Sequence, residues 1–297
     1  MRTSITALGS KGILWHTGSE NRGERDIIAA MRILDGLDLA GFIKERQARQ
    51  VRALRQAHKI FPKLAIVRTS DDPRIAAYIK LKQAYGADIL VDVDEHFVPQ
   101  AEALTLVKTL NDDPSVHGII IQLPIADPTQ TEELVNAVAP QKDVDGLGKN
   151  AVLQPATPLA IIWLLAGYNI ELAGKKIVVV GQGRLVGAPL TRTMQGMGYD
   201  VTPVTKSTAD MELVLRNADV VISGAGVPGL IKKDMIKLGA VVVDAGVATD
   251  KGKLVGDIDD AVRERQDLTI TPPKGGVGPL TVCALFDNVI RAAQTKN

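Results

Sequence analysis

The sequence is poor in cysteine and has no long uninterrupted apolar run. Its single cysteine, Cys283, rules out an internal disulfide framework and fits a reducing compartment. No stretch approaches the roughly 18 consecutive apolar residues of a membrane-spanning helix. We therefore expect a soluble, cytoplasmic protein with no membrane partner.

Aromatic residues and net charge are also scarce, at 3% of the 297 residues and +1 respectively. Nucleic-acid binding depends on basic surfaces and on aromatic stacking platforms, so nucleic acid is not an expected partner. In contrast, 45% of the residues are hydrophobic, which at this length is enough for two domains of ordinary size. We expect small-molecule ligands and no metal site.

The first thirty residues differ in composition from the rest. They mix Gly, Ser, Thr, Arg and Glu, lack an apolar core long enough for a signal peptide, and are followed by a second methionine, Met31. We interpret residues 1–30 as a loosely ordered N-terminal extension. An upstream start or added residues would explain it, and an unusual targeting segment is the alternative.

From Met31 onward, helical and strand periodicities alternate, which predicts βαβ units, parallel sheets and an α/β fold. In the first half, helices are expected at 40–58, 73–85, 100–111 and 129–138, and strands at 63–68, 88–92 and 118–122. In the second half, a helix is expected at 158–166, and strands at 175–180, 200–205, 219–223, 240–244 and 268–271.

A glycine-rich turn lies between the strand at 175–180 and the next helix. Its pattern, with Gly181, Gly183 and Gly187, is one residue longer than the common dinucleotide fingerprint. The first glycine permits a tight turn and the second lets the backbone approach a pyrophosphate at the helix N-terminus. A glycine-rich turn without a ligand is the alternative, but the strand-to-helix context favours a Rossmann-like, doubly wound domain.

The strand at 200–205 bears on the choice of cofactor. An NAD site usually carries an acidic residue near the end of this strand, whereas here it is followed by Lys206. Lys206 and Arg184 of the glycine turn could face a 2′-phosphate, which favours NADP over NAD. Both residues could equally be solvated surface charges.

Catalytic candidates lie in the first half. Tyr78 and Lys82 are four residues apart on an expected helix and so project from one face, although an ordinary surface pair has the same spacing. Gln122 lies at the carboxyl end of an expected strand, where ligand-binding groups concentrate. The alternative is a structural glutamine whose amide bonds to a loop. The segment 142–146 places two carboxylates and an ammonium at the junction of the two halves, which suggests a reaction site. The alternative is a charged surface turn that ends in a glycine.

Taken in order, these motifs resemble the bifunctional methylenetetrahydrofolate dehydrogenase and methenyltetrahydrofolate cyclohydrolase family. The resemblance spans residues 31–293. The matching segments are Arg32-Ile-Leu-Asp-Gly36, Tyr78-x-x-x-Lys82, Ile121-Gln-Leu-Pro124, Lys142-Asp-Val-Asp-Gly146, Pro155-Ala-Thr-Pro158, 181–189, Asp244-Ala-Gly-Val247, Val255-Gly-Asp257 and 275–281.

The resemblance implies two α/β domains flanking a cleft. Residues 31–155 with 275–297 would form the folate-binding catalytic domain, with a last helix at about 281–294 returning to it, and 156–274 the NADP-binding Rossmann-like domain. The resemblance also implies a homodimer that acts in one-carbon metabolism and purine biosynthesis. It would oxidise 5,10-methylenetetrahydrofolate with NADP and hydrolyse the methenyl product to 10-formyltetrahydrofolate.

The resemblance assigns roles to individual residues. Lys82, with its pKa lowered by burial, would transfer protons during hydrolysis. Gln122 would orient Lys82, Tyr78 would stack on the aminobenzoyl group, and Asp145 would bind the pterin. Gly276 and Pro279 would approach the substrate closely. The expected cofactor-binding residues are Gly181, Gln182, Gly183, Arg184, Val186, Gly187, Lys206 and Val247.

The chain departs from the family pattern at several positions. The usual Gly-Arg-Ser of the glycine turn reads Gly181-Gln182-Gly183, the usual Pro-Val-Pro-Gly-Gly contains Lys274, and Ile75 replaces a serine. The segment 146–155 is several residues shorter than usual. These changes bear on nucleotide preference and substrate details.

Two other functions remain as alternatives to the bifunctional enzyme. One is another two-domain NADP-dependent dehydrogenase, acting on a small hydroxy acid or a shikimate-like compound. The other is a non-catalytic folate or nucleotide binder.

Overall fold

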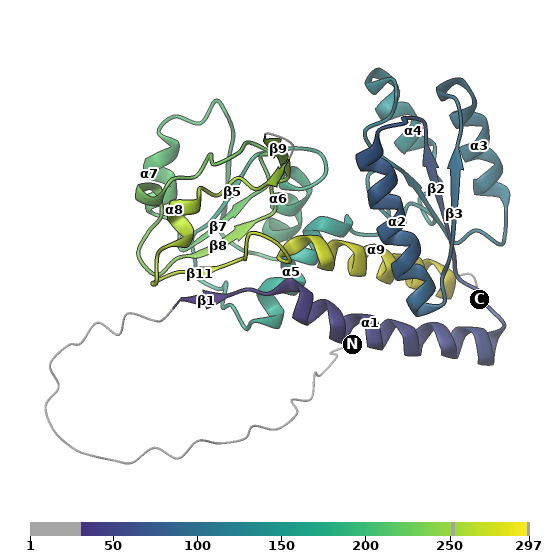
Figure 1. The fold of residues 1–297 in the computed structure, drawn as a ribbon, viewed down its shortest axis with the longest axis horizontal. Helices are drawn as coiled ribbons and strands as arrows, with labels where there is room; N and C mark the ends of the chain where they lie inside the picture. The colour runs from purple at the N-terminus through teal and green to yellow at the C-terminus, as the bar shows by residue number, and fades with distance from the viewer. Residues whose placement is uncertain (1–30, 251–252, 296–297) are drawn as a thin grey trace, which may run out of the picture.

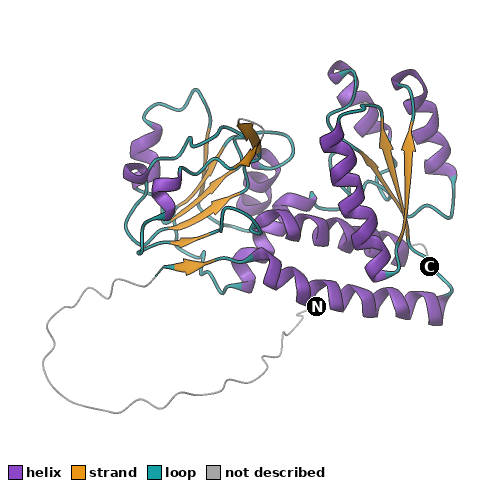
Figure 2. Cartoon of the chain, in the orientation of Figure 1, coloured by secondary structure: helices purple, strands orange, loops and turns teal. Residues whose placement is uncertain are grey.

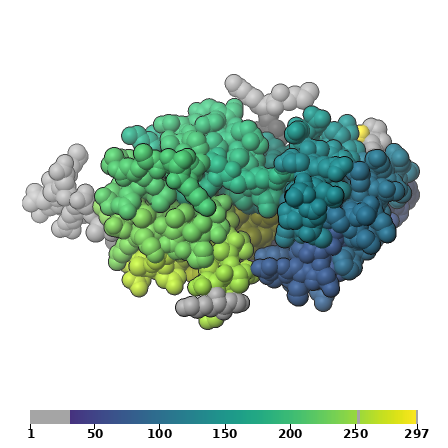
Figure 3. All heavy atoms as spheres, turned by 90° about the horizontal axis from the view of Figure 1, so that it is seen from above, coloured from purple at the N-terminus to yellow at the C-terminus, as the bar shows by residue number. Residues whose placement is uncertain are grey.

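The computed structural model describes residues 31–250 and 253–295, which form two lobes joined by long helices (Figure 1). The expected N-terminal extension, residues 1–30, lies outside the described residues. None of the described helices is long and apolar enough to cross a membrane. Seen from above, the blue-to-teal lobe and the green-to-yellow lobe stand on opposite sides of the molecule (Figure 3).

The first lobe contains a three-stranded parallel sheet in the order β3-β2-β4. Its central strand is buried along most of its length, because helices pack on the sheet and strands flank it on both sides. Its elements are β2 (Lys63–Arg68), α2 (Pro73–Ile89), β3 (Asp92–Phe97), α3 (Gln100–Asp112), β4 (Gly118–Ile121), the 3-10 turn η2 (Pro128–Gln130) and α4 (Thr131–Ala137).

The prediction of a strand at 88–92 is wrong. Helix α2 continues to Ile89, and Leu90 ends it in the left-handed conformation with φ 64°. The chain therefore enters the sheet only at Asp92. Because β3 is an edge strand, it tolerates the exposed charged residues that hid it from a search for apolar runs.

The second lobe contains a six-stranded parallel sheet in the order β1-β11-β8-β7-β5-β6, typical of a doubly wound fold. The strand arrowheads point toward the first lobe (Figure 2). The lobe's elements are β5 (Ile177–Val180), α6 (Gly187–Gly196), β6 (Val201–Val204), α7 (Met211–Arg216), β7 (Val220–Ser223), η3 (Lys233–Met235), β8 (Val241–Asp244), the hairpin β9 (Ala248–Asp250) and β10 (Lys253–Val255), α8 (Asp260–Arg263) and β11 (Thr269–Ile270).

The edge strand β1 (Arg32–Ile33) comes from the beginning of the described chain. It pairs in parallel with β11, so these two residues lie in the sheet of the second lobe. Immediately afterwards, Asp35 caps α1 (Gly36–Ala53) by accepting the N–H groups of Leu37 and Asp38. Helix α1 then runs to the first lobe and ends in the π-helical turn η1 (Leu54–His58).

Two further helices, α5 (Ala156–Gly167) and α9 (Val277–Gln294), complete the connection between the lobes (Figure 1). Helix α9 is buried on nearly all sides and packs on α1 and α5, as its apolar sequence requires. It begins earlier than the expected position near 281, because Pro279 is compatible with the first turn of a helix.

A buried polar contact joins three of these helices. Gln47 of α1 donates from Nε2 to the Cys283 carbonyl oxygen of α9 at 2.8 Å. Its Oε1 accepts the Tyr85 hydroxyl of α2 at 2.7 Å. The Tyr85 ring lies 5.0 Å from that of Phe286, between ring centroids. Polar and apolar contacts thus fix the same helix junction.

Phe286→Ala should destabilise this junction, because Phe286 is fully buried and its removal leaves a cavity. We expect a loss of about 3–5 kcal/mol in the free energy of unfolding, measured by urea denaturation. Phe42→Ala on α1 is the matched control, since Phe42 is 67% exposed. A similar loss in both variants would show that the junction carries no special share of the stability.

Candidate active site

Lys82 and Gln122 meet although they are far apart in the sequence. Lys82 lies on α2, and Gln122 follows β4 directly. The Lys82 ammonium donates from Nζ to Gln122 Oε1 at 2.6 Å. The amide of Gln122 is oriented by a second bond, from its Nε2 to the Leu123 carbonyl oxygen at 3.2 Å. The structure therefore brings together two of the predicted catalytic residues.

Tyr78 lies one turn before Lys82 on the same helix and is 40% exposed. The ring is free to contact a ligand above that face of α2. Ile75, the departure from the family pattern, is buried in the apolar core. The isoleucine at this position therefore contributes to the packing of α2 against the core.

Electrostatic coupling places Asp145 close to Lys82. Burial lowers the pKa of Lys82, and the nearby Asp145 carboxylate opposes that shift. Burial raises the pKa of Asp145 to about 6, against an opposing effect of Lys82 and a smaller reinforcing effect of Asp143. An amine with a lowered pKa and a carboxyl with a raised one suit a site of proton transfer.

Lys142 has a structural role. Its side chain is buried, and Nζ donates to the carbonyl oxygens of Leu110, Asn111 and Asp113 at 2.8, 2.7 and 2.7 Å. These carbonyls end helix α3, where a positive charge is favoured and the last carbonyls need donors. The ammonium of the segment 142–146 therefore holds α3 in place.

Asp143 shapes the turn that follows. Its carboxylate accepts the backbone N–H groups of Gly146 at 2.9 Å and Gly148 at 2.8 Å. Gly146 adopts φ 68°, a conformation that favours glycine. Burial raises the pKa of Asp143, and these backbone donors oppose the shift. Of the three charged residues in the segment, Asp145 is thus the one coupled to Lys82.

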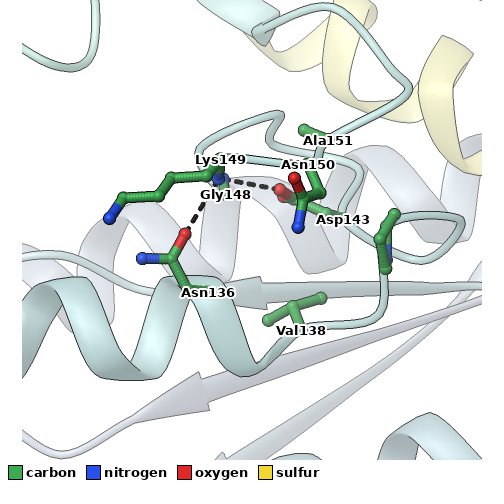
Figure 4. Close-up of a pocket in the computed structure, with 8 residues that line it drawn as sticks. Asn136, Val138, Asp143, Gly148, Lys149, Asn150 and Ala151 are labelled. Carbon is green, nitrogen blue, oxygen red and sulfur yellow. Dashed lines mark hydrogen bonds between the residues drawn. The ribbon is translucent and has the colours of Figure 1, made fainter.

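A small cavity of about 80 Å³ lies beside the same turn. Figure 4 shows Asn136 of α4 accepting the Lys149 backbone N–H, at 2.8 Å, while the Lys149 side chain points away. Asp143 lines the cavity, but Lys82 and Gln122 do not. The cavity therefore belongs to the turn. Among the described residues, no cluster of three or more His, Cys, Asp and Glu side chains is arranged to hold a metal ion.

The glycine turn after β5 contains two positions that accept no side chain and one that is open. A Cβ at Gly181 would lie 2.6 Å from Ala225 Cα, and one at Gly187 would lie 1.7 Å from the Gly181 oxygen, so both positions require glycine. At Gly183, by contrast, a Cβ would meet no atom of the described chain within 4 Å. The second glycine of the turn therefore faces open space.

The other predicted cofactor residues differ in placement. Gln182 turns back on the protein, with Nε2 donating to Thr191 Oγ1 at 3.2 Å, and Val186 packs beside Gly224. Lys206 and Val247 are exposed near the ends of β6 and β8. Arg184 forms an ion pair with Glu132 of α4, in the other lobe.

The segment after β11 meets the start of α1. The Gly275 carbonyl oxygen accepts the N–H groups of Gly36 at 2.8 Å and Leu37 at 3.0 Å. A Cβ on Gly36 would lie 1.7 Å from the Gly276 oxygen, so the two chains touch through their backbones. Gly276 is buried at the N-cap of α9, and Pro279 is partly exposed in its first turn.

Two acidic residues near the site were not predicted from the sequence as part of it. Glu132 opens an unremarkable short helix, and only the fold brings it to Arg184. Asp257 is fully buried and accepts the Ser223 hydroxyl at 2.6 Å and the backbone N–H groups of Ala225 and Val227 at 2.7 and 2.8 Å. It thereby shapes the loop beyond β7. The family resemblance of the segment Val255-Gly-Asp257 was the one sequence feature that pointed to Asp257.

Family models match both parts of the chain. The model described as tetrahydrofolate dehydrogenase/cyclohydrolase, catalytic domain, matches residues 34–145, and that of the NAD(P)-binding domain matches 155–297. The chain is 37% identical over 277 residues to the bifunctional protein FolD of Methanosarcina barkeri, covering 89% of this chain and 96% of the relative. The FolD of Pelobacter propionicus is 38% identical, with 88% and 97% covered.

Solved structures agree with these matches. The bifunctional FolD of Campylobacter jejuni superposes with a TM-score of 0.85 at 34% identity, over 90% of this chain and all of that one. The Trypanosoma brucei enzyme, solved with NADP cofactor and an inhibitor, gives 0.83 at 29% identity, over 90% and 98%. A shikimate dehydrogenase from Thermus thermophilus, at 12% identity and a TM-score of 0.50, shares only the fold.

Asp145→Asn should stabilise the fold at neutral pH. Because the folded-state pKa of Asp145, about 6, lies above the ordinary 3.8, the carboxyl contributes stability at low pH that is lost as the pH rises through 6. We expect the variant to exceed the parent by about 1–2 kcal/mol at pH 7.5, and the difference to shrink toward pH 4. Urea unfolding at several pH values measures this, with Asp92→Asn on the exposed edge strand as control. A variant less stable than the parent at pH 7.5 would contradict the assignment.

Proposed function

The chain belongs to the tetrahydrofolate dehydrogenase/cyclohydrolase family, and from this premise we propose that it catalyses two consecutive steps. It oxidises 5,10-methylenetetrahydrofolate with NADP, and it hydrolyses the 5,10-methenyl product to 10-formyltetrahydrofolate. The contact between Lys82 Nζ and Gln122 Oε1 at 2.6 Å, beside Asp145, is the observation that carries the proposal. A hydroxy-acid dehydrogenase would explain the six-stranded sheet but not this constellation.

The two lobes have separate tasks in this proposal. Residues 31–155 with 275–297 bind folate and perform the proton chemistry, and residues 156–274 bind the cofactor. The packing of α9 on α1 supports grouping the last helix with the first lobe, while the pairing of β1 with β11 makes the division incomplete. The carboxyl ends of the strands in the second sheet are directed toward the first lobe, where the cofactor must face the folate.

The open space at Gly183 supports the binding of dinucleotide phosphates at the glycine turn. Residues 205–208, directly after β6, contain no acid, which supports NADP over NAD. NADP, when bound, accepts the hydride from the one-carbon unit. In the proposal the backbone of Gly181, Gly183 and Gly187 approaches the phosphates, Arg184 and Lys206 face the 2′-phosphate, and Gln182, Val186 and Val247 complete the wall of the site.

Lys82 is the proposed proton-transfer group of the hydrolytic step. Because burial lowers its pKa, a larger fraction of the amine is neutral and able to take a proton from water. The water oxygen bonds to the one-carbon unit of the methenyl cation and gives one proton to Lys82. The bond from that carbon to N5 then breaks with its electron pair on N5, which takes the second water proton, and the 10-formyl product forms. Gln122 holds the amine in position through its hydrogen bond.

The remaining folate-side residues orient the substrate. Asp145 accepts hydrogen bonds from the amino group and ring N–H of the pterin, and Tyr78 stacks on the aminobenzoyl ring, which its exposed position allows. Gly276 and Pro279 approach the substrate where larger or more mobile side chains would not fit. The raised pKa of Asp145 means that the pterin anchor is half ionised at about pH 6 and increasingly ionised above it.

We also propose that the protein is a cytoplasmic homodimer that supplies one-carbon units for purine biosynthesis. This part rests on the family resemblance. Size-exclusion chromatography with light scattering tests the dimer, and a mass of about one chain would contradict it.

A coupled assay tests the proposed function. Purified protein should reduce NADP in the presence of methylenetetrahydrofolate and should hydrolyse methenyltetrahydrofolate without nucleotide. We expect NADP to be preferred to NAD. Absence of both reactions would leave a non-catalytic binder, and a strong preference for NAD would contradict the role given to Arg184 and Lys206.

Lys82→Met should abolish the cyclohydrolase reaction, because methionine fills the same space without a group that can accept a proton. We expect hydrolysis to fall at least about 100-fold, as is typical for loss of a general acid–base group. Lys80→Met is the matched control, since Lys80 lies on the same helix with its side chain in solvent. Unchanged NADP affinity would show that the fold is intact, and retained hydrolysis would remove Lys82 from this role.

A further inference from the structure

An ion pair connects the glycine turn to the opposite lobe. Arg184 Nη2 contacts Glu132 Oε1, and the two residues are 52 positions apart in the sequence. The Arg184 side chain is 30% exposed and that of Glu132 is 62% exposed. Arg184 Nη1 is buried and has no hydrogen-bond partner among the described residues. Because a buried donor is normally satisfied, the guanidinium has an unused bonding position in this state.

Arg184 is also the only charged residue in the turn from 181 to 187. The position where the family usually has an arginine holds Gln182, whose amide Nε2 donates to Val179 O and Thr191 Oγ1 at 3.2 Å each. The amide is thus engaged with the protein itself. Within the turn, Arg184 is therefore the one side chain that can offer a positive charge to a phosphate.

We propose that Glu132 and the 2′-phosphate of NADP compete for Arg184, so that Glu132 sets how strongly the chain discriminates NADP from NAD. The proposal rests on the proposed use of NADP. A carboxylate and a phosphate pair with the same planar donor face of a guanidinium, and the phosphate carries more charge. NAD has no 2′-phosphate and leaves the ion pair intact.

The surroundings of Glu132 allow this exchange. The carboxylate is largely exposed and is solvated once Arg184 leaves, so the cost of breaking the pair is small. Its Oε2 keeps a contact of 3.4 Å with Asn136 Nδ2 on the same helix. Since the pair spans the lobes, entry of the phosphate also removes a direct link between α4 and the glycine turn.

Isothermal titration of NADP and NAD into Glu132→Gln tests the competition. The amide keeps the size of the side chain and removes its charge, so Arg184 becomes available. We expect the Kd for NADP to fall about threefold, as for release of an exposed ion pair, and the Kd for NAD to change less. Glu133→Gln, an exposed neighbour in the same helical turn, should change neither value.

The variant Arg184→Gln provides a second test of the competition. This variant should lose most of its preference for NADP, and adding Glu132→Gln to it should have no further effect, because the two residues act on one interaction. Weaker NADP binding by Glu132→Gln, or an equal gain for NAD, overturns the competition. Failure of the parent protein to bind NADP overturns the proposed cofactor, whereas parent binding with an unchanged Glu132→Gln affinity overturns only the competition.

Discussion

The structure depends on one buried helix. Helix α9 packs on α1 and α5 and also contacts α2 and β4, so its apolar surface is removed from water when these elements assemble around it. The same helix reaches the site, because Asn288 Nδ2 donates to the carbonyl oxygens of Val144 and Gln154 at 2.8 Å each. Helix α9 therefore holds α1 and α5 together and also fixes the position of the turn that carries Asp145.

The buried charged side chains near the site are of two kinds: some stabilise the fold, and others have shifted pKa values that suit proton transfer. Lys142 and Asp143 are buried, but carbonyl oxygens and backbone N–H groups satisfy them, so their burial stabilises the turn. Lys82 and Asp145 have fewer partners, and burial shifts both pKa values toward the neutral forms. A poorly solvated amine and carboxyl cost stability and supply reactivity.

Much of the fold followed from local patterns. The apolar runs at 63–68 and 118–122 became β2 and β4, and the glycine turn after β5 begins a helix as expected. The pattern failed at β3, whose charged residues are tolerated because an edge strand has one free side. It also missed β1, since two residues carry no periodicity and their partner strand β11 lies more than 230 residues further along the chain.

The sequence by itself determined the α/β class, the alternation of helices and strands, and the identity of Lys82, Gln122 and Asp145 as candidates. These conclusions depend on short-range periodicity and on the order of recognisable motifs. Only the tertiary structure decided that Lys82 contacts Gln122, that Lys142 is a helix cap, and that Arg184 pairs with Glu132 in the opposite lobe. Contacts between distant residues arise from the packing of whole elements, and no local pattern records which side chains that packing brings together.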